Sequence, residues 1–287
     1  MVRYRVLSLI PKNLQSYLVG KLSRIKWPLG LAPKINGALA KYLNIDLSDS
    51  KKSLEQFHSF EDLFTRELKE KAREIEGPIC SPCDSILRHL LPIKQGQMIQ
   101  AKGLNYSVED LLSLSEVEKE SFNLSWYGSF YLAPHNYHRV HTPFSGSMLS
   151  ARYIPGQLWP VNDAFVNIVP RLFCRNERVV FELEYEGGGR AYLVMVGALH
   201  VGRIQIKGVD TFVSNSLDRQ LNTNMARTFS FSPPRELQIG DELGTFMLGS
   251  TVILVFDDKL AGLFNFSKIT QAVKIALGES LLKVSNE

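Results

Sequence analysis

The chain has 287 residues, of which 45% are hydrophobic and 22% are charged. This composition is typical of a globular protein with a full core, in one large domain or two modest ones. No apolar run approaches the ~20 residues of a membrane-spanning helix. Only Val6–Ile10 resembles a signal core, so a secretory signal is not expected. Three cysteines without paired spacings favour a reducing compartment.

The net charge of +4 is unevenly distributed along the chain. The first 45 residues contain eight basic residues and no acidic one, so the remainder carries a net charge of −4. The eight are Arg3, Arg5, Lys12, Lys21, Arg24, Lys26, Lys34 and Lys41. A basic arm on a mildly acidic body predicts a polyanionic partner for the arm alone, either nucleic acid or anionic lipid.

Residues 1–70 are predicted to form a basic, amphipathic helical region. Apolar residues recur at helical spacing between Asn13 and Trp27, and a second stripe follows Pro28. The stripes consist of Leu14, Tyr17, Leu18, Leu22 and Ile25, and of Leu31, Ile35, Ala38, Leu39 and Tyr42. Such helices either lie in the headgroup region of an anionic membrane or pack on the protein body with solvated lysines. No nucleic-acid-reading motif is recognisable, so nucleic acid is not expected as a partner.

The remainder, residues 71–287, is predicted to be a β-rich domain. Two short helices are predicted after the capping residues Ser59 and Ser107, and the pattern changes beyond Ser125. Residues 181–185 alternate with period two, and three glycines lead into residues 192–196, which predicts a hairpin. The fold class expected is α+β, with N-terminal amphipathic helices followed by a predominantly antiparallel β core.

Ser250 is the candidate nucleophile because it lies between a glycine and the apolar run 252–256, which predicts a buried strand. Gly249 tolerates backbone angles closed to other residues and lets a nucleophile approach its carbonyl carbon. A serine hydroxyl that attacks the preceding carbonyl turns the peptide into an ester. Elimination then leaves a dehydroalanine, which hydrolyses to a pyruvoyl group. An ordinary turn before a strand fits the same tetrapeptide, so the rest of the chain must decide.

A serine nucleophile needs a base, and His135, His138 and His141 form the densest titratable cluster. The flanking prolines and the lack of neighbouring acidic or thiol ligands argue against a metal site. Asp84 is the acidic residue that would hold the tautomer of the base, although an aspartate after proline also forms turns. The residues therefore predict a relay of Ser250, a histidine and Asp84, with either hydrolysis or self-processing as its outcome.

The pair Cys80 and Cys83 forms a C-x-x-C motif, which is typical of zinc and redox sites. Only Cys174 remains elsewhere, so a four-cysteine site is impossible. The surrounding pattern also lacks the βαβ unit of a thioredoxin-like site. Both cysteines are interpreted as small apolar residues.

Six stretches together resemble the phosphatidylserine decarboxylases, in the order in which that family shows them. They are Phe64–Leu68, Ser81–Asp84, Lys102–Ser107, Tyr137–Pro143, Asn176–Val179 and Leu248–Thr251. The likeness covers nearly the whole chain and is least specific in the N-terminal arm. In the family a glycine usually follows the aspartate, whereas this chain has Ser85, a departure that affects the turn and leaves the carboxylate in place.

The resemblance implies that the chain cuts itself between Gly249 and Ser250, into a β chain of residues 1–249 and an α chain of residues 250–287. Ser250 would become the covalent pyruvoyl cofactor, activated by His141 and with Asp84 orienting that base. The substrate amine would form a Schiff base with the pyruvoyl group, and loss of carbon dioxide would convert phosphatidylserine to phosphatidylethanolamine. His138 would donate a proton to the substrate carbon.

A phospholipid substrate also implies a site that faces a bilayer. Each lysine or arginine near an anionic surface contributes ~1 kcal/mol to binding, so the arm supports peripheral association. A bacterial-type enzyme at the cytoplasmic face of the inner membrane is expected, and the resemblance further implies a homodimer.

Two rival interpretations remain. A Ser-His-Asp hydrolase would leave one intact chain, but Leu248 and Val252 stand where its G-x-S-x-G elbow has glycines. A non-catalytic membrane-binding module would be unaffected by Ser250→Ala.

Overall fold

The computed structural model describes residues 11–28, 30–101, 103–121, 123–199, 203–210, 212–214, 225–247 and 250–285. Of the residues singled out above, Arg3, Arg5, the stretch Val6–Ile10, Lys102, Leu248 and Gly249 lie outside this part of the chain. The backbone of Ser250 lies inside it.

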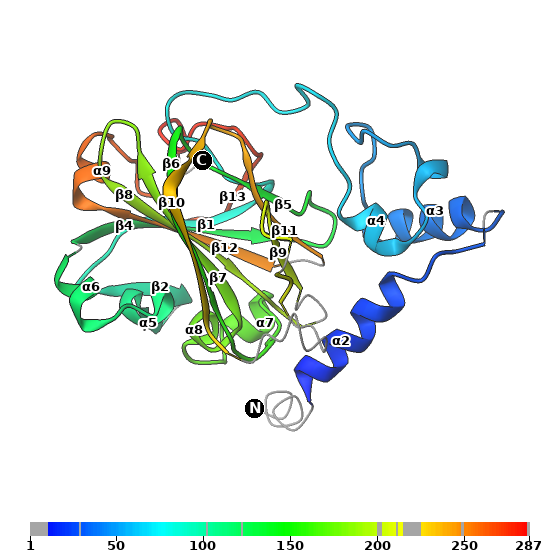
Figure 1. The fold of residues 1–287 in the computed structure, drawn as a ribbon, viewed down its shortest axis with the longest axis horizontal. Coiled ribbons are helices and arrows are strands. Elements are labelled where there is room, and N and C mark those ends of the chain that lie inside the picture. Colours follow the sequence, from blue (N-terminus) through cyan, green and yellow to red (C-terminus); the bar gives the residue numbers. More distant parts are fainter. Residues whose placement is uncertain are drawn as a thin grey trace.

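The N-terminal helices lie to one side of a β-rich body, as the α+β prediction requires (Figure 1). They are α2 (Lys12–Ser23), α3 (Ala32–Leu43), the 3₁₀ turn η1 (Leu54–Gln56) and α4 (Phe60–Phe64). A small buried cluster of Ala40, Ile45, Phe57 and Leu63 joins α3 to the segment that follows it. Residues 65–84 then lead across the top of the view into the body (Figure 1).

An eight-stranded antiparallel sheet forms the centre of the body, and its strand order is β10-β6-β7-β8-β12-β4-β1-β13. The strands are β1 (Ser85–Pro92), β4 (Leu124–Leu132), β6 (Gly146–Ile154), β7 (Arg178–Tyr185), β8 (Arg190–Val196), β10 (Arg227–Leu237), β12 (Ser250–Asp257) and β13 (Val273–Ile275). The predicted hairpin is β7–β8, and Gly188 and Gly189 both have a φ of +89° in its turn. Positive φ of this kind favours glycine over any other residue.

Different elements cover the two faces of this sheet. A three-stranded sheet of β5 (Arg139–His141), β11 (Glu242–Phe246) and β9 (Ile204–Ile206) packs into one apolar core. A second core lies against the hairpin β2 (Gln97–Ala101) and β3 (Leu104–Ser107), α5 (Val108–Leu112), α7 (Asp163–Val166) and α8 (Leu172–Arg175). Two further short helices are α6 (Glu116–Ser121) and α9 (Asp258–Gly262).

β12 lies between β8 and β4 and is buried on both faces. Val252 and Leu254 belong to the first core, whereas Ile253 and Val255 belong to the second. A strand covered on both sides has no polar face, which explains why residues 252–256 are continuously apolar instead of alternating. Ser250, at the start of β12, pairs with Leu132 of β4, and from Thr251 onward the strand is paired on both edges, which positions the backbone of Ser250 firmly.

Both predicted capping residues begin helices. The Ser59 hydroxyl accepts a hydrogen bond from the backbone N–H of Asp62 (3.1 Å), and Ser107 accepts one from Asp110 (3.3 Å). Each bond satisfies an N–H that the first helical turn leaves without a partner.

α2 packs on the body through a face opposite to the one that amphipathic packing predicts. Its buried residues are Lys12, Ser16, Gly20 and Ser23. Its leucines Leu14, Leu18 and Leu22 are 50%, 51% and 61% exposed. The helix ends at Ser23, short of the predicted limit at Trp27.

α3 is similar, because it buries Ala32, Asn36 and Ala40. Leu31, just before the helix, and Tyr42, in its last turn, are exposed. None of the described helices is long and apolar enough to span a membrane.

Asn176, just before β7, connects Trp159 to Gly197, which follows β8. Its amide nitrogen donates to the backbone oxygens of Trp159 and Gly197 (2.8 Å each), and its amide oxygen accepts from the N–H of Trp159 (2.9 Å). Asn176→Ala leaves these buried groups without partners, so we expect the free energy of unfolding to fall by about 2 to 4 kcal/mol. Urea denaturation measures this loss. The exposed Asn167→Ala serves as control, and an equal loss in both variants would contradict the assignment.

Candidate functional site

The chain passes from the small sheet to the large one just before Ser250. Thr245 of β11 pairs with Arg139 of β5, and the backbone N–H of Phe246 donates to the carbonyl of His138 (3.0 Å). Four residues later Ser250 pairs with Leu132 of β4 in the large sheet. His138 directly precedes β5 and His141 is its last residue. Both histidines therefore lie beside β11, the strand that leads into the predicted cleavage position.

His141 has its basic nitrogen defined by two hydrogen bonds. Its Nδ1 lies 2.7 Å from the carbonyl oxygen of Gly240, which can only accept, so Nδ1 carries the proton. Its Nε2 is then the lone-pair nitrogen, and it accepts from the hydroxyl of Tyr137 (3.2 Å), whose ring is stacked on the imidazole. Burial lowers the pKa of His141, which keeps the imidazole neutral near pH 7.

Asp84 lies beside the segment of His141, because the backbone N–H of His141 donates to the carbonyl of Pro82 (2.9 Å). Its carboxylate, however, is held by other groups. Arg73 binds it with Nε (3.0 Å) and Nη2 (2.7 Å), and the backbone N–H of Leu277 donates to it (2.8 Å). In the described residues no hydrogen bond joins Asp84 to His141. The carbonyl of Gly240 accepts the hydrogen bond that was expected to go to Asp84. Burial lowers the pKa of His141 overall, and the charges of Glu242 and, less strongly, Asp84 oppose that lowering.

His138 is completely buried, and its ring lies 4.0 Å from that of Phe64 of α4. Its Nδ1 donates to the carbonyl of Asn136 (2.8 Å), so Nε2 is the lone-pair nitrogen. Within the part of the chain that the structure describes, that nitrogen has no hydrogen-bond partner. Burial, assisted by the charge of Arg66, lowers the pKa of His138 to about 3. In this state His138 accepts a proton at Nε2 and has none to donate there.

Arg66 lies next to the same loop with its guanidinium only partly used. It is 5% exposed, and its Nη2 donates to the carbonyls of His135 (3.1 Å) and Asn136 (3.3 Å). Its Nε and Nη1 are buried without partners. The region around His138 thus combines a positive charge with two unpaired polar side chains.

A cavity of about 400 Å³ reaches Tyr137 and His141. Five basic residues line it against three acidic ones: Lys69, Lys71, Arg73, Arg139 and Lys207, against Glu67, Asp241 and Glu242. This excess of positive charge suits an anionic ligand.

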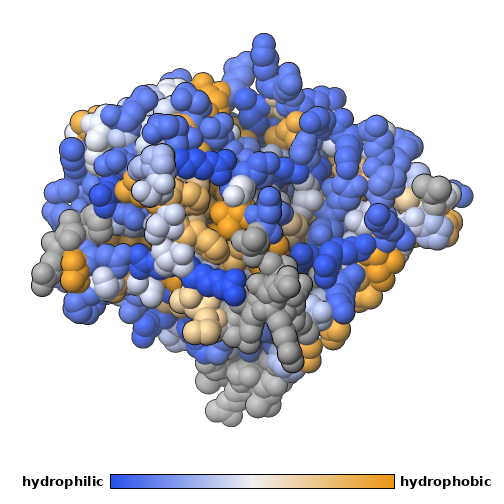
Figure 2. All heavy atoms as spheres, viewed as in Figure 1, coloured by the Kyte–Doolittle hydropathy of each residue, from blue (hydrophilic) through white to orange (hydrophobic). Residues whose placement is uncertain are grey.

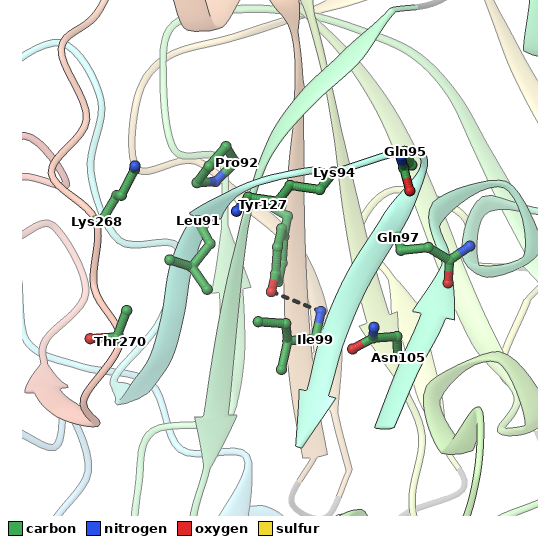
Figure 3. Close-up of a pocket in the computed structure, with 10 residues that line it drawn as sticks. All are labelled: Leu91, Pro92, Lys94, Gln95, Gln97, Ile99, Asn105, Tyr127, Lys268 and Thr270. Atoms are coloured by element: carbon green, nitrogen blue, oxygen red, sulfur yellow. Dashed lines mark hydrogen bonds between the residues drawn. The ribbon is translucent and has the colours of Figure 1, made fainter. Parts of the chain in front are cut away.

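A second cavity, of about 540 Å³, lies between β1, the β2–β3 hairpin and residues 268–270 (Figure 3). Its wall combines apolar side chains such as Leu91 and Ile99 with the lysines Lys94 and Lys268, and the Tyr127 hydroxyl accepts from the N–H of Ile99 (2.9 Å). It shares no residue with the cavity at His141.

The cysteines have the surroundings of structural residues. Cys80 and Cys83 are buried free thiols, and burial raises the pKa of Cys80 to about 12, so neither suits thiolate chemistry. Among the described residues, no three metal-ligating side chains are close enough together to hold an ion.

Comparison with known proteins bears directly on this site. The sequence profile of the family named phosphatidylserine decarboxylase matches residues 60–283. A phosphatidylserine decarboxylase proenzyme of Alcanivorax borkumensis is 38% identical over 255 residues, which cover 87% of this chain and 85% of that protein. The chain belongs to the phosphatidylserine decarboxylase family.

Other members of the family have the same extent. The proenzyme of Anaeromyxobacter sp. (strain K) is 36% identical over 279 residues, covering 96% of this chain and 95% of its own. That of Acinetobacter baylyi is 37% identical, covering 88% and 86%. As a member of this family the chain is an enzyme, a carboxy-lyase.

The fold brings together the family motifs that lie far apart in the sequence. Phe64 and Arg66 of the first motif contact the His138 loop of the fourth, and Pro82 of the second contacts His141. Sequence reasoning assigned no role to Tyr137, Gly240 or Arg73, which hold His141 and Asp84. Tyr137 was already inside a recognised motif, whereas nothing in the local sequence marks Gly240 or Arg73.

The pair of Arg73 and Asp84 is the strongest ion pair at the site, because two guanidinium nitrogens bind one shielded carboxylate. We expect Arg73→Ala to reduce the free energy of unfolding by about 1 to 3 kcal/mol, since it leaves a mostly buried carboxylate without its cation. Asp49→Ala removes only the more exposed partner of Arg73 and should cost less than about 1 kcal/mol. Urea denaturation of both variants decides this, and equal losses would refute it.

Proposed function

We propose that this enzyme decarboxylates phosphatidylserine to phosphatidylethanolamine with a pyruvoyl group made from its own Ser250, after cleavage between Gly249 and Ser250. The observation that carries the proposal is the position of two buried, neutral histidines along the strand leading into Ser250, in a chain of this family. The relatives are named proenzymes, which is consistent with a chain that must process itself.

His141 is the proposed base for the first step. Its Nε2 has a lone pair, and the hydrogen bond from Nδ1 to Gly240 fixes the tautomer that places it there. Transfer of the Ser250 hydroxyl proton to His141 would make an imidazolium, which the negative charge of Asp84 stabilises. Asp84 acts over a longer range in this proposal than in a hydrogen-bonded triad, because Arg73 and Leu277 occupy its oxygens.

The environment of His138 fits a small carbonyl group. Its buried Nε2 has no hydrogen-bond partner among the described residues, and its backbone pairs with the strand that leads to Ser250. Once present, the pyruvoyl group supplies a keto carbonyl that binds the substrate amine covalently and withdraws electrons as carbon dioxide leaves. Phe64 beside His138 excludes water there, which disfavours a charged carboxylate and so favours its departure.

His138 is proposed to deliver a proton to the substrate carbon. With a pKa of about 3 it is unprotonated in the free enzyme, so it must first take up a proton at Nε2. The phosphodiester or carboxylate of the substrate, placed near Arg66, offsets the positive charge that helps to lower this pKa. Substrate binding would thereby prepare the proton donor.

This function predicts two chains in the purified protein. Intact mass spectrometry should find an α chain of residues 250–287 that lacks an amino group and reacts with a carbonyl-directed amine. His141→Ala should remain a single chain, because Ser250 loses its base. His138→Ala should still be cut but decarboxylate at least about 100-fold more slowly.

Ser250→Ala is the control that must stay uncut. An intact, carbonyl-free wild-type chain that hydrolyses esters and is labelled at Ser250 would instead indicate a serine hydrolase. Equal cleavage of the His141 and His138 variants would refute their division of roles.

The N-terminal helices are proposed to bring the site to an anionic bilayer, as a peripheral protein of the cytoplasmic face of the inner membrane. Figure 2 shows hydrophobic side chains in a row along the outer side of α2, at the lower right. Leu14, Leu18 and Leu22 form this row, and exposed basic residues such as Lys21 and Arg24 accompany it. Because α2 contacts the body through small and polar residues, its apolar face is free to enter lipid headgroups.

We expect the triple variant Leu14→Ser, Leu18→Ser, Leu22→Ser to bind vesicles of phosphatidylserine and phosphatidylcholine at least about tenfold more weakly, because apolar area is removed. Raising the ionic strength should weaken binding of the wild type further, since the basic residues are exposed. Vesicle sedimentation measures both effects.

The matched control changes three exposed apolar residues elsewhere to serine, Val117, Ile168 and Leu263. An equal loss of binding in that control would contradict a specific role of α2.

A further inference from the structure

Glu177 is a buried carboxyl group that the chemistry described above does not use. It is 2% exposed, and within the described part of the chain no lysine, arginine or histidine lies at ion-pair distance from it. Its Oε1 accepts from the hydroxyl of Ser214 (2.8 Å) and its Oε2 is 3.2 Å from that of Tyr153. The Ser214 oxygen in turn accepts from the N–H of Ile204 (2.9 Å), which directs the hydroxyl proton of Ser214 to Glu177.

The strand register places Glu177 in the same row as Ser250. The N–H of Gly197 donates to the carbonyl of Glu177 (2.9 Å), so these two residues are opposite each other. On the next strand pair Val196 is opposite Thr251, and continuing that register by one residue brings Gly197 opposite Ser250. Glu177 directly precedes β7 and Gly197 directly follows β8, so this extended register continues across both residues to Ser250 at the start of β12.

Gly197, the middle residue of this row, has no side chain, and the carboxyl side chain of Glu177 lies over it. A Cβ atom on Gly197 would lie 3.0 Å from Cγ of Glu177, 3.3 Å from its Oε1 and 3.2 Å from Cδ2 of Leu158, so the side chains of Glu177 and Leu158 both extend over Gly197. Only one strand spacing, ~4.8 Å, then separates Gly197 from the backbone of Ser250. A single bridging water molecule spans such a gap and can carry a proton across it.

The surroundings also suit proton transfer. Burial without a cation raises the pKa of Glu177 to about 7, so the acid and its conjugate base coexist near neutral pH. A group of this pKa both takes and returns protons efficiently under those conditions.

We propose that Glu177 is the proton acceptor for the elimination at residue 250, the step after ester formation. The inference rests on the proposed self-processing. The Cα proton of residue 250 passes to the Glu177 carboxylate, its electron pair forms the Cα=Cβ bond, and the Cβ–O bond breaks. The oxygen leaves with the new carboxylate of residue 249. The same proton then returns to Cβ, and water replaces the nitrogen of residue 250, which departs as ammonium.

This division gives each proton transfer its own group. His141 of β5 belongs to the small sheet, whereas Glu177 directly precedes β7 of the large sheet. The two therefore reach residue 250 from different elements, and one acts before the ester exists and the other after it.

Glu177→Gln tests the proposal, because an amide keeps hydrogen bonds to both hydroxyls but cannot accept the proton. The variant should form the ester and stop there, with carbonyl formation slowed at least about 100-fold. Hydroxylamine should then split it into a chain ending in a hydroxamate at residue 249 and a chain starting with an unmodified Ser250. Intact mass spectrometry follows both products, and circular dichroism verifies the fold.

Gly197→Ala provides a second variant that keeps the carboxyl group but displaces it, and it should accumulate the same ester. Glu182→Gln, on the strand that follows Glu177 and paired with Arg190, is the matched control and should process like the wild type. Carbonyl formation at the wild-type rate in Glu177→Gln or Gly197→Ala overturns the proposal. So does a folded Glu177→Gln chain that hydroxylamine cannot split. A wild-type chain that never processes refutes the proposed function itself.

Discussion

The central position of β12 is the constraint on which the site depends. Hydrogen bonds to β8 and β4 on its two edges and apolar cores on its two faces fix where the strand begins. Ser250 is its first residue, and the chain reaches it from a different sheet. A change of sheet within a few residues makes the peptide bond before Ser250 a junction between two rigid structures. The proposed self-cleavage at this junction would separate two chains that the intact strands continue to hold together.

Neutrality of the histidines is the second common feature. Burial disfavours the imidazolium form of both His138 and His141, so each has a lone pair at Nε2 at neutral pH. The difference between them lies in their partners. The Tyr137 hydroxyl binds Nε2 of His141. In the described residues, Nε2 of His138 is unpaired and lies near Arg66. No described carboxylate is at hydrogen-bond distance from Arg66. The first arrangement suits chemistry within the chain, and the second suits an anionic substrate that brings the missing charge.

The arrangement of α2 connects the site to its proposed location. A helix that contacts the body with Ser16 and Gly20 while exposing three leucines gives up hydrophobic stabilisation that the opposite orientation would provide. An apolar surface that covers these leucines would restore this stabilisation, and the bilayer of the proposed location would be such a surface.

The sequence by itself determined the elements whose signals are local. The capping serines, the glycine turn between β7 and β8 and the doubly buried run of β12 follow from neighbouring residues, and the ordered motifs identify the family. Only the tertiary structure decided which groups meet. Nδ1 of His141 donates to the carbonyl of Gly240, and Arg73 and Leu277 donate to the oxygens of Asp84. Glu177 lies in the row that includes Ser250. The tertiary structure also turned the apolar face of α2 outward, because periodicity defines a face but not what that face contacts. These contacts join residues 11 to 193 positions apart, and long-range pairing of that kind arises from strand order and packing, which no local pattern encodes.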